Sequence, residues 1–393
     1  MDPPASSPRI AKNVWTISAA NFFIAAFTKC YMLLPVYMAA SGVTNPGRIG
    51  WLMGSFYVST FARPFVGWFT DEFGFRKVLL FSGALSALSG LGILFTRPES
   101  VTVLIGWRIL SGTAYSLFAV SLTAYQSLVI TGEGRGAGLS VVTSTTNLPY
   151  LLVVPACEVL LAWGLLKTYL LMPILLALAS CWIALELPEA KLPPREPRAK
   201  GAKTAFVMQN PQVRMLLYSI TLFCSVDAGL LSVAALGRER GISVSAFFAA
   251  SAVTSLGMRF FGRALVDRLP RVRSSWACAA AAAVVLAAAP FPVVHGAVGF
   301  GVCGALYGLF IGLGYPMLLA LIGDVAPPEQ RSRVTSLFWF FMGLSYLGLP
   351  VLTGYLAALF RYRAAFALIN LGLIPLLAYL GLRWEALQKR DRH

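Results

Sequence analysis

The chain has 393 residues, of which 58% are hydrophobic and only 12% are charged, and its mean hydropathy is +0.72. Soluble proteins carry about twice that share of charge, so the composition excludes an ordinary soluble domain and predicts a protein embedded in a lipid bilayer. The formal net charge is +16. Because Lys and Arg gather at both termini and in alternate joints, the positive-inside rule explains this charge, and we expect no nucleic-acid partner.

Apolar stretches of about 20 residues or more, long enough to cross a bilayer as helices, recur along the chain. Six are predicted in the first half, at residues 13–40, 48–70, 76–96, 100–130, 136–163 and 167–187. Six more follow, at residues 212–237, 243–266, 274–294, 296–323, 331–358 and 363–384. The expected fold is therefore an all-α membrane protein of twelve transmembrane helices in two six-helix bundles, residues 1–187 and 212–393, with a Pro-, Lys- and Arg-rich cytoplasmic linker at 188–211.

The start of the chain and its cysteines give expectations about location and ligands. The first residues hold no apolar run before a small-residue cleavage site, so we expect the first span itself to direct insertion into the inner or plasma membrane. The basic joints place both termini in the cytoplasm. The six cysteines lie in apolar segments without CxxC spacing or clustered His, so we expect no metal site and no cofactor.

The two halves of the sequence repeat at an offset of 196 positions. The offset relates Arg63 to Arg259, Asp71 to Asp267, Gly112 to Gly308, Glu133 to Glu329, Arg135 to Arg331 and Tyr150 to Tyr346. Charged residues are scarce in this chain, so chance is a poor explanation for four charged pairs. Duplicated six-helix halves are typical of transporters that bind their substrate near the membrane midplane between the halves.

The joint after the second span carries a recognisable pattern. It contains Gly67, then Asp71 after three residues, then Gly74 and the basic pair Arg76 and Lys77. This pattern resembles the signature loop of the major facilitator superfamily. A diverged copy at residues 263–273 keeps Asp267 but has Arg263 and Pro270 where the first loop has glycines.

Other segments extend the resemblance over essentially the whole chain. Arg108 and Gly112 are similar to the Arg and Gly motif of the family's fourth span, and the joints at 133–135 and 329–331 also fit. The resemblance implies a secondary transporter that works by alternating access, with a small-molecule substrate and no enzymatic activity.

The signature residues predict a conformational latch. Gly67 would let its helix approach another closely, and Asp71 would pair with a helix N-terminus or a cation in one conformation only. Arg76 and Lys77 would lie near anionic headgroups, where they could equally do no more than set the topology. Arg63 and Arg259 could join the latch or snorkel. The expected latch comprises Gly67, Asp71, Arg76, Lys77, Arg63, Asp267 and Arg259.

Charges inside apolar spans are costly unless they are paired or hydrated, so they are candidates for function. Four qualify, namely Lys29, Arg108, Glu158 and Asp227. In this family spans one, four, seven and ten line the cavity, so the resemblance places Lys29, Arg108 and Asp227 along the transport path. Asp227 is the candidate for proton coupling, although it could instead neutralise a cation. Glu158 is a second candidate, which interfacial exposure explains as well.

The two cations favour a substrate with a carboxylate, phosphate or similar group, although Arg108 could act in coupling as readily as in binding. Polar and aromatic residues of nearby spans could complete the site, and packing is the alternative role of each aromatic. The predicted substrate site consists of Lys29, Arg108, Tyr115, Asn147, Tyr150, Tyr307 and Tyr346.

The direction of transport has a weaker signal. The fifth span keeps Pro149 and Pro155 but lacks the Gly-Pro pair common in the family's antiporters. The short chain and minimal loops still resemble bacterial efflux carriers, so we expect proton-coupled export of an anionic or zwitterionic molecule by a monomer. A weaker resemblance is to exporters of opine-type metallophores. The alternatives are a proton-coupled importer of an organic anion and a non-transporting membrane sensor or assembly factor.

Overall fold

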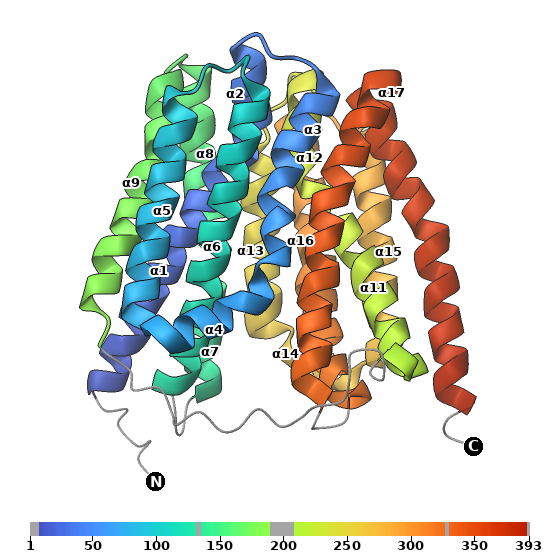
Figure 1. Cartoon of the computed structure of the whole chain (residues 1–393). Helices are drawn as coiled ribbons and strands as arrows, with labels where there is room; N and C mark the ends of the chain where they lie inside the picture. Colours follow the sequence, from blue (N-terminus) through green and yellow to red (C-terminus); the bar gives the residue numbers. More distant parts are fainter. Residues whose placement is uncertain (1–7, 131–134, 189–207, 327–329, 391–393) are drawn as a thin grey trace. The chain divides into compact units, whose positions relative to one another are not determined.

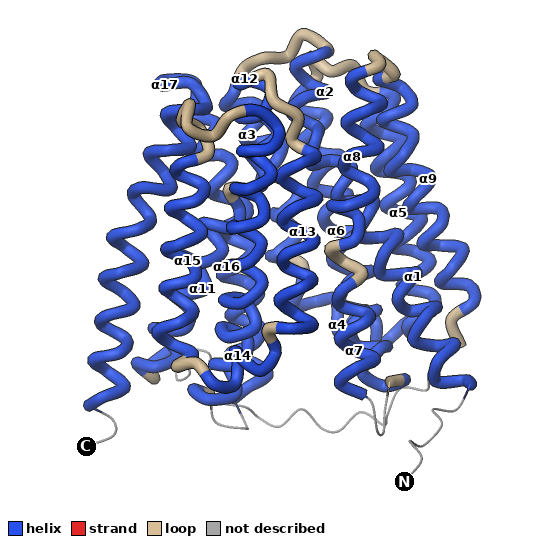
Figure 2. Tube along the Cα trace, turned by 180° about the vertical axis from the view of Figure 1, so that it is seen from behind, coloured by secondary structure: helices blue, strands red, loops and turns tan. Residues whose placement is uncertain are grey.

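The computed structural model describes residues 8–130, 135–188, 208–326 and 330–390, and in these ranges the regular secondary structure is entirely helical (Figure 1, Figure 2). Helices satisfy every backbone hydrogen bond within their own segment, which a bilayer requires of a lipid-exposed chain. Side-chain caps begin two of the described helices, α3 (Pro46–Gly54) and α11 (Pro211–Ala228). The Asn45 side chain accepts a hydrogen bond from the Arg48 N–H at 3.1 Å, and Asn210 does the same for Gln212 at 2.9 Å.

The helices of the first half group into six segments. These are α1 (Pro8–Cys30), η1 (Tyr31–Leu33) and α2 (Leu34–Ala40); α3 (Pro46–Gly54), η2 (Ser55–Phe61) and α4 (Arg63–Phe73); α5 (Phe75–Phe95); α6 (Val101–Val129); α7 (Arg135–Ser144) and α8 (Leu148–Ala162); and α9 (Leu166–Glu186). Several predicted spans therefore consist of two or three short helices rather than one.

The second half supplies six more segments. These are α11 (Pro211–Ala228) and α12 (Leu230–Arg240); α13 (Ser245–Phe261) and α14 (Arg263–Arg268); α15 (Arg271–Ala288); α16 (Gly296–Val325); and the two parts of α17 (Arg331–Arg390), which meet at Arg361. Arg361 has a φ of +66°, so the helix is interrupted there. α15 stops before Pro290, earlier than the predicted end at 294, because a proline lacks the N–H that continues a helix.

Nine stretches of the described residues are long and apolar enough to cross a membrane. One of them, Arg333–Lys389, contains both parts of α17. The segments at 46–73 and 245–268 fall outside the nine because they are broken into shorter helices. With these taken into account, the helices agree with the twelve spans that the sequence predicts.

The contacts divide the chain into two compact units. The first contains Met1–Leu34 and Phe61–Arg195, and in it α5 packs on α6 and α9, and α1 on α9. The second contains Pro35–Thr60 and Glu196–His393, and its main packing pairs are α13 with α16 and α17 with α11, α15 and α3. Residues 35–60 thus group with the second unit, whereas the boundaries predicted from the repeat assign them to the first; those boundaries remain a prediction.

Glycines allow α3 and α17 to pack closely within the second unit. A Cβ atom added to Gly354 would lie 2.5 Å from the Pro46 carbonyl oxygen, and one added to Gly54 would lie 2.5 Å from the Leu347 carbonyl oxygen. Any larger residue at these positions would force the two backbones apart.

Candidate functional site

In the first unit, Lys29 lies at the end of α1 and contacts Tyr150 near the start of α8. The Lys29 ammonium donates a hydrogen bond to the Tyr150 hydroxyl at 2.8 Å and lies 4.3 Å from the centre of the ring. Both side chains are half-buried. The structure therefore brings together two residues that were predicted separately from the sequence. The Tyr150 hydroxyl and the π face of its ring both stabilise the Lys29 cation away from bulk water.

Arg108 is enclosed by the packing of the first unit. It lies on α6 with only 4% of its surface exposed, and its guanidinium carbon is 4.7 Å from the centre of the Tyr31 ring. Tyr31 belongs to η1 and is itself buried. Because its surroundings enclose it, Arg108 would reach a substrate only after a rearrangement, so its role in substrate binding stays a prediction.

The polar stretch at 143–147 interrupts the fifth span. α7 ends at Ser144 and α8 begins at Leu148, and Asn21 of α1 donates to the Val142 carbonyl at 2.7 Å and to Thr145 at 3.0 Å. Asn147 precedes α8, and in the described structure its buried Nδ2 atom has no hydrogen-bond partner. This amide is therefore a donor that a bound molecule could satisfy.

Two further predicted residues lie on the same helices. Tyr115 is half-buried on α6, two turns beyond Arg108. Glu158 is half-buried on α8, about two turns beyond Tyr150. In the part of the chain that the structure describes, neither side chain forms a hydrogen bond with Lys29. The role of Tyr115 in substrate binding and that of Glu158 in proton coupling therefore stay predictions.

In the second unit, Asp227 accepts hydrogen bonds from two tyrosine hydroxyl groups. It lies at the end of α11, where the helix breaks before α12; Tyr307 of α16 donates to its Oδ1 and Tyr346 of α17 donates to its Oδ2. A carboxylate is an acceptor with two oxygens, so the two phenols engage both of them. Hydrogen bonds to a charged group are roughly twice as strong as neutral ones, so the carboxylate ties three helices together.

Aromatic rings extend from this carboxylate. The Tyr346 ring stacks on the Tyr57 ring of η2, with centroids 4.8 Å apart and planes at 22°. The Tyr307 ring packs on Phe247 of α13, with centroids 5.7 Å apart. Tyr57 could not be predicted from the repeat, because the related position, 253, holds Val.

The repeat relates the two tyrosines that contact ionisable groups. Tyr150 and Tyr346 are 196 positions apart, and one hydroxyl accepts from the Lys29 ammonium while the other donates to the Asp227 carboxylate. A phenol hydroxyl can both donate and accept, so one residue type serves charges of opposite sign.

The first signature segment is helical up to a single turning residue. α4 continues to Phe73, and Gly74, with a φ of +82°, separates it from α5. Positive φ favours glycine, which explains why the pattern needs one there. In the copy, Pro270 holds the equivalent joint in an extended conformation with a φ of −65°, the angle that its ring imposes.

The predicted latch residues lie at this joint, at its copy, or on the helices that lead into them. Asp71 and Lys77 are exposed, and Arg76 donates to the Leu185 carbonyl at the end of α9 at 2.7 Å. The Arg63 Nε atom lies 3.5 Å from the Ser116 hydroxyl. Of the others, Gly67 lies in α4, Asp267 in α14 and Arg259 in the last turn of α13, whereas Glu133 and Glu329 fall outside the described residues.

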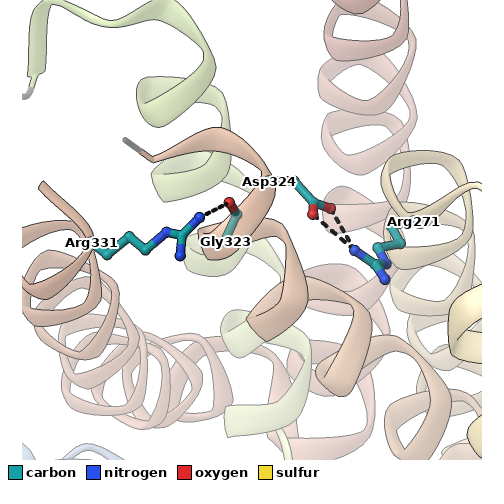
Figure 3. A network of polar contacts seen from close by, with 4 residues as sticks. All are labelled: Arg271, Gly323, Asp324 and Arg331. Atoms are coloured by element: carbon teal, nitrogen blue, oxygen red, sulfur yellow. Dashed lines mark hydrogen bonds and ion pairs between the residues drawn. The ribbon is translucent and has the colours of Figure 1, made fainter. Parts of the chain in front are cut away.

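A polar network that the sequence did not predict lies at the end of α16 (Figure 3). Arg271, the first residue of α15, forms an ion pair with Asp324 at 2.8 Å. Arg331 donates to the carbonyl groups of Gly323 at 3.1 Å and Ala326 at 3.3 Å. The last carbonyls of a helix have no partner inside the helix and carry partial negative charge, so Arg331 stabilises this end of α16.

Comparison with known proteins assigns the family. The sequence model of the Major Facilitator Superfamily matches residues 16–347 and 297–392, which is most of the chain. The chain belongs to the major facilitator superfamily. As a member of that superfamily it is a secondary transporter with a small-molecule substrate and several membrane spans, and not an enzyme. The prediction of family and fold is confirmed.

Solved structures of other superfamily transporters share the fold. A variant of the nucleoside transporter NupG has a TM-score of 0.77 at 13% identity, with 94% of this chain and 99% of that chain covered. A bacterial homologue of the human lysosomal transporter Spinster has a TM-score of 0.72 at 14% identity, with 98% and 99% covered. The human organic anion transporter MFSD10 (TETRAN) has a TM-score of 0.67 at 16% identity, with 97% and 100% covered. No curated protein sequence matches the chain.

Proposed function

We propose that this superfamily member exports a small organic molecule that carries an anionic group, in exchange for protons and by alternating access. The observation that carries the proposal is the Asp227 carboxylate, which lies at a helix break inside a span and holds α16 and α17 through Tyr307 and Tyr346. An acidic group inside a membrane span is costly, and it is typical of proton pathways. Protonation would weaken two hydrogen bonds that join three helices, so it has a direct structural consequence.

The anionic character of the substrate rests on the first unit. Lys29 offers an ammonium group whose present partner is a neutral hydroxyl, which a substrate carboxylate or phosphate could replace with a stronger interaction. The buried amide of Asn147 and the hydroxyl of Tyr150 add donors on α8 and at its start. An opine-type metallophore, with several carboxylates, is one molecule of this chemistry. The human transporter MFSD10 (TETRAN), which has the same fold, is named as an organic anion transporter.

The remaining parts of the proposal concern topology and gating. We expect a monomer in the cell membrane. Both termini should lie in the cytoplasm, because the basic joints alternate along the chain. The signature residues Asp71 and Asp267 are proposed as conformation-dependent latch groups, with Arg76 and Lys77 at the lipid surface.

Transport into proteoliposomes tests the proposal directly. Purified protein is reconstituted in a known orientation and offered anionic, zwitterionic and cationic solutes, with and without an imposed pH gradient. We expect anionic or zwitterionic solutes to move in the direction opposite to the proton flux. We expect Asp227→Asn to abolish this gradient-driven movement, while exchange of solute remains. Full gradient-driven activity in Asp227→Asn would remove Asp227 from the coupling.

The same experiment separates the alternative functions. A proton-coupled importer of an organic anion would move solute in the same direction as protons. A sensor or assembly factor would move no solute in any gradient. The sign of the flux therefore decides between the two transporters, and its absence across the panel would favour the third role.

A further inference from the structure

Two 3-10 helices of the described chain, η1 and η2, lie where it passes between the two contact units. η1 (Tyr31–Leu33) ends next to the passage at residues 34 and 35, and η2 (Ser55–Phe61) spans the passage at residues 60 and 61. A 3-10 helix is wound more tightly than an α-helix and has poorer hydrogen-bond geometry, so a stretch of seven residues within a span is unusual and often marks a hinge. This geometry makes η2 a candidate hinge.

η2 is in direct contact with α17, the helix that carries Tyr346, one of the two tyrosines that donate to the Asp227 carboxylate. Tyr57 of η2 stacks on Tyr346 of α17 with centroids 4.8 Å apart. About one turn earlier on α17, Gly343 lies against the side chain of Thr60, so closely that an added Cβ atom would clash with it. Two contacts thus hold η2 against α17 at and beside Tyr346. Because packed interiors transmit strain, a displacement of Tyr346 would also displace η2.

We propose that Tyr57 is a positioning residue that transmits the protonation state of Asp227 to the 3-10 segment Ser55–Phe61, which changes its conformation when Asp227 takes up a proton. The proposal rests on the proton-binding role proposed for Asp227. It extends that role to a segment and a side chain that do not touch the carboxylate.

The chemistry of the carboxylate explains how the signal arises. In the ionised form both oxygens accept from tyrosine hydroxyls, and both hydrogen bonds are charge-assisted. A proton on Oδ2 removes the negative charge and gives that oxygen an O–H donor, so the hydrogen bond from the Tyr346 hydroxyl loses its charge assistance and the hydroxyl can accept instead. The titratable groups that face Asp227 in the described structure include Tyr307 of α16, Tyr346 of α17 and, one turn earlier on α11, the Cys224 thiol.

Hydrogen exchange measured by mass spectrometry tests the proposal without a known substrate. The full-length protein in lipid nanodiscs is compared at acidic and alkaline pH, with rates corrected for the intrinsic pH dependence of exchange. We expect peptides covering 55–61 to exchange more slowly at alkaline pH in the wild type. In Tyr57→Leu, exchange at alkaline pH should be about two- to ten-fold faster, the factor that one lost aromatic pair allows, and the pH response should disappear.

Matched variants separate transmission from a general loss of structure. Tyr57→Phe keeps the ring and should behave as the wild type, and Asp227→Asn should abolish the pH response of 55–61. In each variant, unchanged exchange in 271–288, the helix α15 of the same unit as Tyr57 and Asp227, reports that the fold is intact. A full pH response in Tyr57→Leu, or one that persists in Asp227→Asn, would overturn the proposal. If Asp227→Asn loses gradient-driven transport while wild-type 55–61 shows no pH response, the proposed function stands and this inference fails.

Discussion

Asp227 occupies the position in the second repeat that Tyr31 occupies in the first, 196 positions earlier. The Tyr31 ring lies under the Arg108 guanidinium, whereas the Asp227 carboxylate receives the hydroxyls of Tyr307 and Tyr346. The same position of the repeat thus carries a tyrosine in one unit and a carboxylate in the other.

The two tyrosines that bind Asp227 can be tested separately by removing their hydroxyls. Tyr307→Phe and Tyr346→Phe each delete one hydrogen bond to the carboxylate, and a bond to a charged group contributes about 1.5–3 kcal/mol. Because the lost bond favours the ionised form, the proton should bind more readily and the pH dependence of transport should move toward higher pH by about one unit or more. Transport rates measured across a pH series check this. An unchanged profile in both variants would mean that the phenols serve packing alone.

Lys29 should determine the preference for anionic solutes. Lys29→Ala removes the ammonium that Tyr150 now holds, so we expect affinity for anionic solutes to fall about ten-fold or more, with cationic solutes little affected. Competition among solutes of different charge in proteoliposomes measures the effect. The exposed cation Lys167 provides a matched control, and Lys167→Ala should leave the profile unchanged. Equal losses for solutes of every charge in Lys29→Ala would contradict charge selection by this residue.

The burial of Arg108 gives it an expected packing role, which can be tested against its predicted role in substrate binding. It is 4% exposed and lies over the Tyr31 ring, so Arg108→Lys should lower the stability of the folded protein by about 1–2 kcal/mol and reduce the transport of all solutes alike. Thermal unfolding in detergent and the solute panel are the two measurements. A loss confined to anionic solutes would instead place Arg108 in the substrate site.

The glycine contact between α3 and α17 predicts a difference between two glycines of the same helix. Gly354→Ala introduces a Cβ atom 2.5 Å from the Pro46 carbonyl oxygen, so it should destabilise the protein by about 1–3 kcal/mol. Gly348 on α17 has open space around it, and Gly348→Ala should be neutral or stabilising by up to about 1 kcal/mol because alanine favours the helix. Thermal unfolding of both variants is the check. Equal stabilities would show that the contact is not tight in solution.

Much of the fold could be predicted from the sequence because lipid imposes a simple rule. Each span must be about 20 residues long, apolar and helical, so composition and the length of the apolar runs predicted the segments from 13–40 to 363–384 within a few residues. Where prolines stand in an apolar joint, as at Pro290, the predicted end was too late, because hydropathy does not register a missing N–H. The 3-10 turns at Tyr31–Leu33 and Ser55–Phe61 had no signal in hydropathy at all.

The candidate site divides in the same way. Scarce charges in apolar spans pointed to Lys29 and Asp227, and the repeat pointed to Tyr150 and Tyr346, since buried charge is costly and a repeat preserves positions. Which of these residues touch could not be read from the sequence. The pairing of Lys29 with Tyr150 joins residues 121 positions apart, and the pairing of Asp227 with Tyr346 joins residues 119 apart.

The membrane character, the helical class, the number of spans and the family followed from hydropathy, charge placement and motif, which are local properties of the chain. The partners of each buried charge, the stack that brings Tyr57 to the carboxylate and the ion pair of Arg271 with Asp324 depended on how the helices pack. Packing depends on side-chain shape at close range, and small residues such as Gly54 and Gly354 decide which helices can approach, so only the folded structure reveals these relationships.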